Sequence, residues 1–458
     1  MTLQPLDQIS NLRLSNYTRI VEVGDGTSVL INFPHHVSDI VSTTFGASLH
    51  GDLDGLPADV AEHAERVGYL TRHSEEAEAR WFAARVRDIA DRYGDQKKII
   101  FTFVTTNTCN LACSYCFQSS TEMRTLPSRF LTVEQARAGL DMVDAHIASG
   151  ARINHLELFG GEPLLPSTVR LVETIVEGAV ARNLTVRATT NAFYLDRFEH
   201  LLGPGRIDNL QITLDGTQEH HDTRRIGTAG KPTFAVILDN IERALRCGVR
   251  VEVRANIDQR NVESLPDLVV LLDERGILTH DLASFDHVNV WPDPAAPDAT
   301  ADPDLYLTRS QIDTYLRSRL EEYPVLEGVI DQEPPLARWL TAVMETPHIR
   351  FCGAGDSNVF ISPESKVYSC NELVGVESSA VGVVEDGAIK RLPLWDKWSD
   401  RRIDKLINCR KCSVSFAHGG GCGARLSPDK LGLIGNCGTF QQDFDDTVRR
   451  LAAAGSPQ

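Results

Sequence analysis

The chain has 458 residues, which suggests two to four domains rather than one. Hydrophobic residues make up 42% and charged residues 24%, a composition that excludes a disordered or fibrous chain. The 63 acidic and 46 basic residues give a net charge of −17, which argues against broad electrostatic binding to nucleic acid or to an anionic membrane.

The first 95 residues predict a small α+β domain. Strand-like segments at Tyr17–Val23 and Ser28–Asn32 flank an Asp-Gly turn signal, as in a hairpin. Helical patterns follow at Pro57–Val67 and Ser74–Tyr93, the second opened by Ser74 as N-cap.

Residues 96–300 alternate between strand and helix patterns. The predicted strands are Lys98–Thr106, Ile153–Phe159, Leu184–Thr190, Asn209–Leu214, Val249–Asn256 and Phe285–Val290, and the predicted helices include Val133–Ala148, Thr168–Arg182, Phe234–Arg246 and Val262–Glu274. Six β-then-α units imply parallel strands with right-handed crossovers. Six units are too few for a closed eight-unit barrel, so the expected fold is α/β, a partial (β/α)6 barrel of the TIM type. A helical bridge over residues 301–345 then leads to a cysteine-rich domain over residues 346–450.

Ten cysteines are the unusual feature of the composition. The chain shows neither a membrane span nor a secretion signal, which predicts a cytoplasmic protein. In that reducing compartment the cysteines favour metal or redox chemistry over disulfides. They fall into two groups, with Cys247 alone between them on an amphipathic helix, where burial is the expected role.

The first group follows the first predicted barrel strand, where barrel active sites lie. Cys109, Cys113 and Cys116 form a CxxxCxxC run. Three thiolates can hold three irons of a [4Fe–4S] cluster and leave the fourth iron for another ligand. The alternative is a zinc site, but structural zinc takes four protein ligands and this loop supplies three.

Together with Phe117, this run resembles the hallmark of the radical SAM superfamily. The resemblance implies a [4Fe–4S] cluster that binds S-adenosylmethionine and cleaves it reductively to a 5′-deoxyadenosyl radical. Further segments match the family at successive strand ends and imply cofactor contacts: the GGEP-like motif of Gly160, Gly161, Glu162 and Pro163, then Asn191, Thr213 and Arg254. Glu162 would meet the methionine amino group and Arg254 the carboxylate.

The second group resembles the SPASM extension of radical SAM enzymes that modify peptides and proteins. The resemblance implies two auxiliary [4Fe–4S] clusters. One would take Cys352, Cys370 and Cys422, and the other Cys409, Cys412 and Cys437. His418 stands where that family has a cysteine, and it is either a fourth ligand or a residue of a mobile glycine-rich loop. Zinc between Cys409 and Cys437 is a further alternative.

Counting ligands sharpens this expectation. Three clusters with one open iron on the first would need eleven protein ligands, whereas nine cysteines and His418 make ten. One auxiliary iron should therefore lack a protein ligand and be open to a substrate group.

The SPASM resemblance implies a peptide substrate. Sulfatase-maturing relatives have an aspartate after the second tail cysteine, but here Asn371 follows Cys370, and an amide is no base. Glu372 is a substitute catalytic candidate if its side chain points inward. This favours maturation of a ribosomally made precursor peptide through a thioether or a carbon–carbon or carbon–oxygen cross-link. The alternatives are sulfatase-maturase-like protein oxidation, a small-molecule radical SAM dehydrogenase, and an iron–sulfur sensor without turnover.

The expected partners follow from the same resemblance. They are a precursor peptide with a leader, an electron donor such as flavodoxin or ferredoxin, and neither nucleic acid nor membrane. Peptide-maturing relatives often carry a winged-helix-like domain that binds the leader by adding it as a strand to a sheet edge. The segment of residues 1–95 fits that role, or else it only covers the barrel.

Overall fold

A computed structural model describes residues 8–51, 53–94, 98–119, 127–227, 230–291, 303–330 and 335–454. The chain divides into two compact units. The barrel unit comprises residues 98–332 and 357–393, and the tail unit comprises residues 1–97, 333–356 and 394–458.

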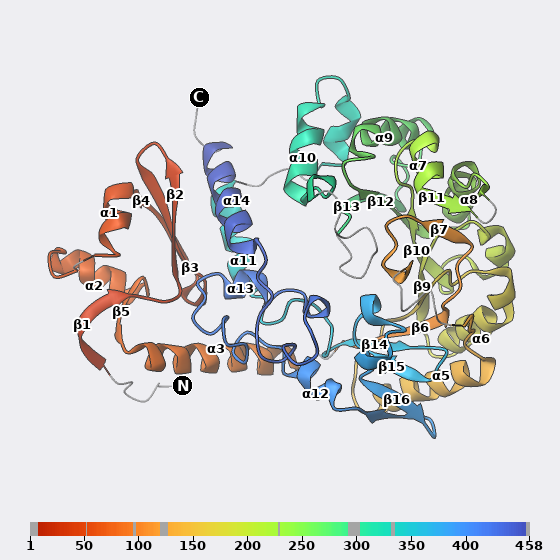
Figure 1. Ribbon diagram of the computed structural model, residues 1–458, viewed down its shortest axis with the longest axis horizontal. Coiled ribbons are helices and arrows are strands. Elements are labelled where there is room, and N and C mark those ends of the chain that lie inside the picture. Colours follow the sequence, from red (N-terminus) through yellow and green to blue (C-terminus); the bar gives the residue numbers. More distant parts are fainter. Residues whose placement is uncertain are drawn as a thin grey trace. The chain divides into compact units, whose positions relative to one another are not determined.

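The barrel unit is built on six parallel strands that lie side by side in chain order (Figure 1). They are β6 (Ile100–Thr106), β8 (His155–Gly160), β9 (Thr185–Thr190), β10 (Ile207–Thr213), β12 (Arg250–Ile257) and β13 (Ala283–Asn289). The crossover helices are α5 (Val133–Ala148), α6 (Val169–Val180), α8 (Phe234–Arg246) and α9 (Leu265–Glu274). The expected α/β architecture with a parallel sheet is confirmed, and each predicted strand lies within two residues of an observed one at either end.

The strands alternate between two faces, as β structure requires. In β12, Val251, Val253 and Ala255 are buried, while Glu252 and Arg254 between them are half-buried. Helix α8 packs against this strand. One face of the sheet is therefore apolar and covered, and the other carries polar side chains.

The sheet continues beyond the six strands. β14 (Asn358–Ile361) pairs in parallel with β6, and β15 (Lys366–Tyr368), β16 (Gly382–Glu385) and β17 (Ala388–Arg391) follow in antiparallel order. Val104 of β6, Phe360 of β14 and Tyr368 of β15 share a small hydrophobic core. Residues 357–393, which the sequence assigned to the cysteine-rich region, thus extend the barrel sheet, and Cys370 lies in the barrel unit.

Shorter elements complete the barrel unit. They are β7 (Leu111–Cys113), α7 (Gln218–Arg224), β11 (Arg225–Gly227) and α10 (Arg309–Ser318), the last within the expected helical bridge. Residues 292–302, around the expected end of the barrel, lie outside the described residues.

The tail unit begins with two small sheets. β2 (Thr18–Gly24), β3 (Thr27–Asn32) and β4 (Val37–Ser42) form an antiparallel sheet, and β1 (Gln8–Leu14) pairs with β5 (Leu70–His73). The predicted hairpin is therefore confirmed as β2–β3. The helices are α1 (Thr43–Ser48), α2 (Ala58–Arg66), α3 (Glu75–Gly94), α11 (Leu336–Glu345), α12 (Leu394–Ser399), α13 (Ser415–His418) and α14 (Phe440–Ala454). Ser74 caps α3 as predicted, since its hydroxyl accepts from Ala77 N at 3.2 Å.

One hydrophobic core joins the two ends of the chain within the tail unit. The ring of Tyr17 stacks on Phe82 at 4.6 Å, and Phe82 meets Phe416 edge-on at 5.2 Å. The hydroxyl of Tyr17 also donates to the carbonyl of Arg410 at 2.6 Å, between Cys409 and Cys412. The N-terminal segment and the cysteine-rich region were expected as separate domains, but here they share one core.

No helix in the described ranges combines the length and the apolar character that crossing a membrane requires.

The shared core predicts that an N-terminal substitution destabilises the cysteine-rich tail. Phe82 is fully buried, so Phe82→Ala should cost about 3–5 kcal/mol. The measurement is urea denaturation followed by circular dichroism, with limited proteolysis reporting on residues 394–454. Ile40→Ala, at a position 70% exposed, is the control and should leave both readouts unchanged. Equal protection of the tail in the two variants would contradict a shared core.

Candidate functional site

The CxxxCxxC loop leaves the end of β6 and is held by a strand pairing. β7 pairs with β11 in antiparallel fashion, which sets Cys113 opposite Arg225 and Ala112 opposite Ile226. Ser114 N also donates to Arg224 O at 3.2 Å. The loop is therefore fixed to the segment that follows α7.

The three thiols of the loop are suited to bind the iron ions of a cluster. Burial raises the pKa of Cys109 to about 12 and that of Cys113 to about 11, and the neighbouring thiols add to both shifts. The Cys109 sulfur accepts from Leu111 N at 3.4 Å, and Asn191 Nδ2 lies at 3.8 Å. Thiolates at these positions need a nearby positive charge, which iron would supply.

Across the described ranges, no group of three or more His, Cys, Asp or Glu side chains is arranged to chelate one metal ion. A [4Fe–4S] cluster takes one thiolate on each iron, so its ligands need not converge on a single point. The donor set of one loop with three thiols therefore fits that cluster.

A buried polar network lies behind the loop. The hydroxyl of Tyr115 donates to Asp215 and accepts from Arg225 Nη1 at 2.8 Å and from Asn256 Nδ2 at 3.1 Å. Asp215 Oδ1 in turn accepts from Asn256 N at 2.9 Å. Burial raises the pKa of Tyr115 well above its ordinary value, and the Arg225 charge opposes the rise in the pKa of Cys113. The network therefore places a fixed positive charge beside a loop cysteine.

The GGEP-like motif packs against the backbone that leads into Cys109. Gly160 has a φ of +143°, and a Cβ there would lie 2.2 Å from Thr106 O. A Cβ on Gly161 would lie 2.4 Å from Thr108 O. Gly161 N and Glu162 N donate to these same two carbonyls, each at 2.9 Å. Glycine at both positions permits this close approach.

Glu162 is almost fully buried and links two strand ends. Its Oε1 accepts from Leu164 N at 2.9 Å and from Thr190 Oγ1 at 2.5 Å, and its Oε2 accepts from Asn191 N at 2.6 Å. Burial raises the pKa of Glu162, against these hydrogen bonds. A carboxylate offers about four acceptor positions, so Oε2 keeps room for one more donor, such as an ammonium.

The remaining predicted cofactor residues lie at or near strand ends of the same unit. Asn191 Nδ2 donates to Asn110 Oδ1 at 2.9 Å, next to Cys109. Arg254 pairs with Glu252 at 2.7 Å and reaches Asp286 at 3.6 Å. Its Nε is buried and has no hydrogen-bond partner among the described residues, which leaves a donor for a carboxylate.

Three other predicted residues lie nearby in the chain or the sheet. Thr213 is half-buried at the end of β10, and Phe117 is half-buried at the start of a short 3-10 helix that runs from Phe117 to Ser119. Pro163 is buried, and its carbonyl accepts from Thr168 Oγ1 at 2.8 Å.

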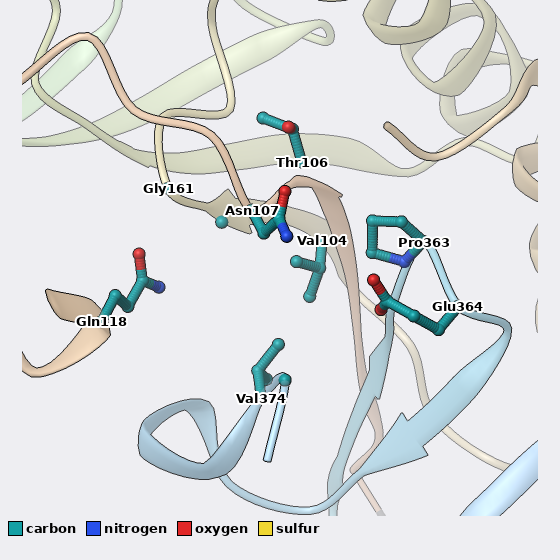
Figure 2. A pocket seen from close by; sticks show the side chains of 10 residues that line it. Val104, Thr106, Asn107, Gln118, Gly161, Pro363, Glu364 and Val374 are labelled. Carbon is teal, nitrogen blue, oxygen red and sulfur yellow. The ribbon is translucent and has the colours of Figure 1, made fainter. Parts of the chain in front are cut away.

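A small pocket adjoins the two glycines (Figure 2). Its lining residues are Val104, Thr106, Asn107, Gln118, Gly160, Gly161, Pro363, Glu364, Val374 and Gly375. Glu364 comes from the turn between β14 and β15, and Arg129 Nε lies 3.8 Å from its carboxylate. Glu364 was not predicted from the sequence, because a single carboxylate in a Ser-Pro-Glu-Ser turn does not indicate a binding site.

Glu372, the predicted catalytic candidate, is half-buried in a short 3-10 helix from Asn371 to Leu373. It is not among the residues that line this pocket. Its catalytic role stays a prediction.

The tail unit gathers one predicted ligand set. Cys409 is buried, and burial raises its pKa to about 12, with Cys437 and Cys412 adding to the rise. Asn408 Nδ2 donates to the Cys437 sulfur at 3.4 Å, and Gln441 Nε2 reaches the Cys412 sulfur at 3.7 Å. Cys409, Cys412 and Cys437 thus lie near one another, and their binding of one cluster stays a prediction.

The side chain of His418 packs against two aromatic rings. Its ring stacks on Phe440 at 4.0 Å and meets Phe351 at 6.0 Å. Burial lowers the pKa of His418 to about 4, so the imidazole is neutral near pH 7, which is the form that binds metals. Whether it ligates iron stays a prediction.

The other predicted set draws on both units. Cys352 and Cys422 lie in the tail unit and Cys370 in the barrel unit, so this grouping stays a prediction. Cys247 caps the end of α8 and is half-buried, outside both sets.

Comparison with known proteins agrees with this site. Residues 103–272 match the family model of the Radical SAM superfamily. The chain is 30% identical over 141 residues to a GTP 3′,8-cyclase of Nostoc sp., covering 31% of this chain and 42% of the relative. It is 27% identical over 172 residues to the pre-heme d1 synthase of Dinoroseobacter shibae, covering 38% of this chain and 40% of the relative. The chain thus spans less than half the length of these two curated relatives.

Solved structures extend the similarity at the level of the fold. Native anSMEcpe with bound AdoMet and Cp18Cys peptide matches with a TM-score of 0.56 and 16% identity, over 78% of this chain and 99% of that chain.

The network behind the loop predicts that Tyr115→Phe loosens the site. The substitution removes one partner each from buried Asp215 and Arg225, which should cost about 1–3 kcal/mol and lower iron retention in the loop. The measurements are the urea midpoint of the cluster-free protein and iron per chain after reconstitution. Tyr194→Phe is the control, because no hydrogen bond of the Tyr194 hydroxyl is seen in the described part of the chain. Identical behaviour of the two variants would refute a role for the network.

Proposed function

We propose that this chain is a radical SAM enzyme that modifies a ribosomally made precursor peptide, since residues 103–272 match the model of the Radical SAM superfamily. The pocket beside Gly160 and Gly161 carries this proposal. It is lined by the end of β6 and by Pro363, Glu364, Val374 and Gly375, so a substrate group in it would lie next to the glycines of the cofactor motif.

The chain's own residues define what the site does. Cys109, Cys113 and Cys116 would hold the [4Fe–4S] cluster, and Glu162 and Arg254 would orient the amino and carboxylate groups of S-adenosylmethionine. When bound, the cluster and S-adenosylmethionine supply a hydrogen-abstracting radical. Glu364 would bind a hydrogen-bond donor of the peptide, and a flavodoxin or ferredoxin would supply the electron.

The tail supports a peptide rather than a small molecule. The curated relatives named above act on small molecules by their names, but they match only 31% and 38% of this chain. The fold of anSMEcpe, solved with a bound peptide, covers 78%. Two auxiliary clusters, held by the six cysteines from Cys352 to Cys437, would accept the electron that a cross-link releases as the second hydrogen is lost.

The test is anaerobic incubation of the reconstituted protein with S-adenosylmethionine, dithionite and a candidate precursor peptide taken from a short reading frame near its gene. Mass spectrometry should show loss of two hydrogen atoms per cross-link. Guanosine triphosphate in place of the peptide is the counter-probe. Turnover of the nucleotide with an unchanged peptide would contradict the proposal.

Glu364 gives a sharper test of the pocket. Glu364→Gln keeps the size of the side chain and removes its charge, so KM for the peptide should rise about tenfold, the loss of one charge-assisted hydrogen bond of about 1.5 kcal/mol. The value of kcat should change little. Glu377→Gln, at an exposed carboxylate of the same unit that pairs with Lys366, is the matched control. A KM equal in both variants would exclude Glu364 from substrate binding.

The leader of the precursor would add to β4, the edge strand of the N-terminal sheet. Deleting the N-terminal segment cannot test this, because that segment shares a core with the tail. Lysine on an edge strand disfavours strand addition, so Ile40→Lys should weaken leader binding, measured by fluorescence anisotropy. Val236→Lys, at an exposed position of α8, is the control. Unchanged affinity in Ile40→Lys would place the leader elsewhere.

A further inference from the structure

Arg401 is buried at the centre of the tail unit, with 5% of its surface exposed. Its guanidinium donates to four backbone carbonyls. Nη1 donates to Leu431 O at 2.6 Å and to Ile434 O at 2.9 Å, and Nη2 donates to Gly420 O at 2.8 Å and to Gly421 O at 3.0 Å. These carbonyls precede Cys422 and Cys437, so one side chain ties together the two loops that carry these cysteines.

The positive charge of Arg401 has no carboxylate partner. Among the described residues no Asp or Glu forms an ion pair with it, and its buried Nε has no hydrogen-bond partner. The next residue differs: Arg402 pairs with Asp404 at 2.6 Å. An unpaired buried charge costs several kcal/mol, so this one needs a compensating anion.

The titratable groups near the guanidinium are four cysteines and His418. Burial lowers the pKa of Arg401, and the charges that oppose this are the thiolates of Cys409, Cys422, Cys352 and Cys437. Backbone geometry agrees. A Cβ on Gly420 would lie 3.9 Å from the Cys409 sulfur, and a Cβ on Gly423, directly after Cys422, would lie 3.0 Å from Arg401 Nε. Arg401 thus lies between cysteines of both predicted auxiliary sets.

We infer that Arg401 is a positioning residue shared by the two auxiliary clusters. Its charge compensates the negative charge of the cluster thiolates and raises the reduction potential of both clusters. This inference rests on the proposed auxiliary clusters. Reduction adds an electron to a cluster, and a nearby buried cation favours the reduced form. Arginine is required because only its planar fork reaches four carbonyls at once.

The experiment uses the full chain with Cys109, Cys113 and Cys116 replaced by Ala, so that all bound iron belongs to the auxiliary clusters. Arg401→Gln removes the buried charge, and Arg401→Lys keeps the charge but loses the fork. Lys405→Gln removes one charge from an exposed side chain four residues away and is the matched control. Iron per chain, the EPR-monitored reduction potential and thermal unfolding of the cluster-free protein are measured.

Arg401→Gln should shift the oxidised-to-reduced ratio at fixed potential at least tenfold toward the oxidised form, which is 59 mV for one electron. Alternatively, the Arg401→Gln protein loses iron, while its cluster-free form unfolds at the same temperature as the cluster-free parent. Arg401→Lys should stay nearer the parent potential, and Lys405→Gln should match the parent.

Two results would overturn the inference. The first is a reduction potential and an iron content in Arg401→Gln equal to those of Lys405→Gln. The second is an equal drop in the unfolding temperature of the cluster-free protein in Arg401→Gln and Arg401→Lys, which would show a structural role only. A parent protein that retains no tail iron would instead refute the auxiliary clusters, and this inference with them.

Discussion

Buried arginines beside cysteine thiols are the constraint on which the rest of this structure depends. Arg225 lies next to Cys113 in the barrel unit, and Arg401 lies among four cysteines in the tail unit. Burial disfavours the thiolate, as the raised pKa of Cys109 and Cys409 shows, and it also disfavours the guanidinium, since it lowers the pKa of Arg401. Iron bound to these thiolates would relieve both costs, because the ligated cluster would be anionic and would face a fixed cation.

The barrel unit brings its site together by strand order. Parallel strands in chain order present their carboxyl ends at one edge, so the loop after β6, the glycines after β8 and Asn191 after β9 meet there. Glu162 joins the last two through its hydrogen bonds. The addition of β14 beside β6 carries the turn with Glu364 to the same pocket. A late segment of the chain thereby contributes to a site built by the early ones.

Local patterns in the sequence predicted the strands and the motifs, but not the long-range packing. The six barrel strands were found because apolar runs alternate with amphipathic helices, and the loop cysteines because their spacing is distinctive. β14 was missed because four residues far along the chain carry no period. Tyr115, Arg225, Glu364 and Arg401 were missed because each acts through partners distant in sequence. The shared core of Tyr17, Phe82 and Phe416 was not predicted, for the same reason.

The central claim is that the loop of Cys109, Cys113 and Cys116 forms a radical-generating centre. The most direct test is the yield of 5′-deoxyadenosine from the reconstituted protein with S-adenosylmethionine and dithionite, in the parent chain and in two variants. We expect the nucleoside from the parent chain and from a variant with Cys409 and Cys412 replaced by Ala. None should form when Cys109, Cys113 and Cys116 are replaced. A parent protein that retains iron in this loop and yields no 5′-deoxyadenosine would contradict the account.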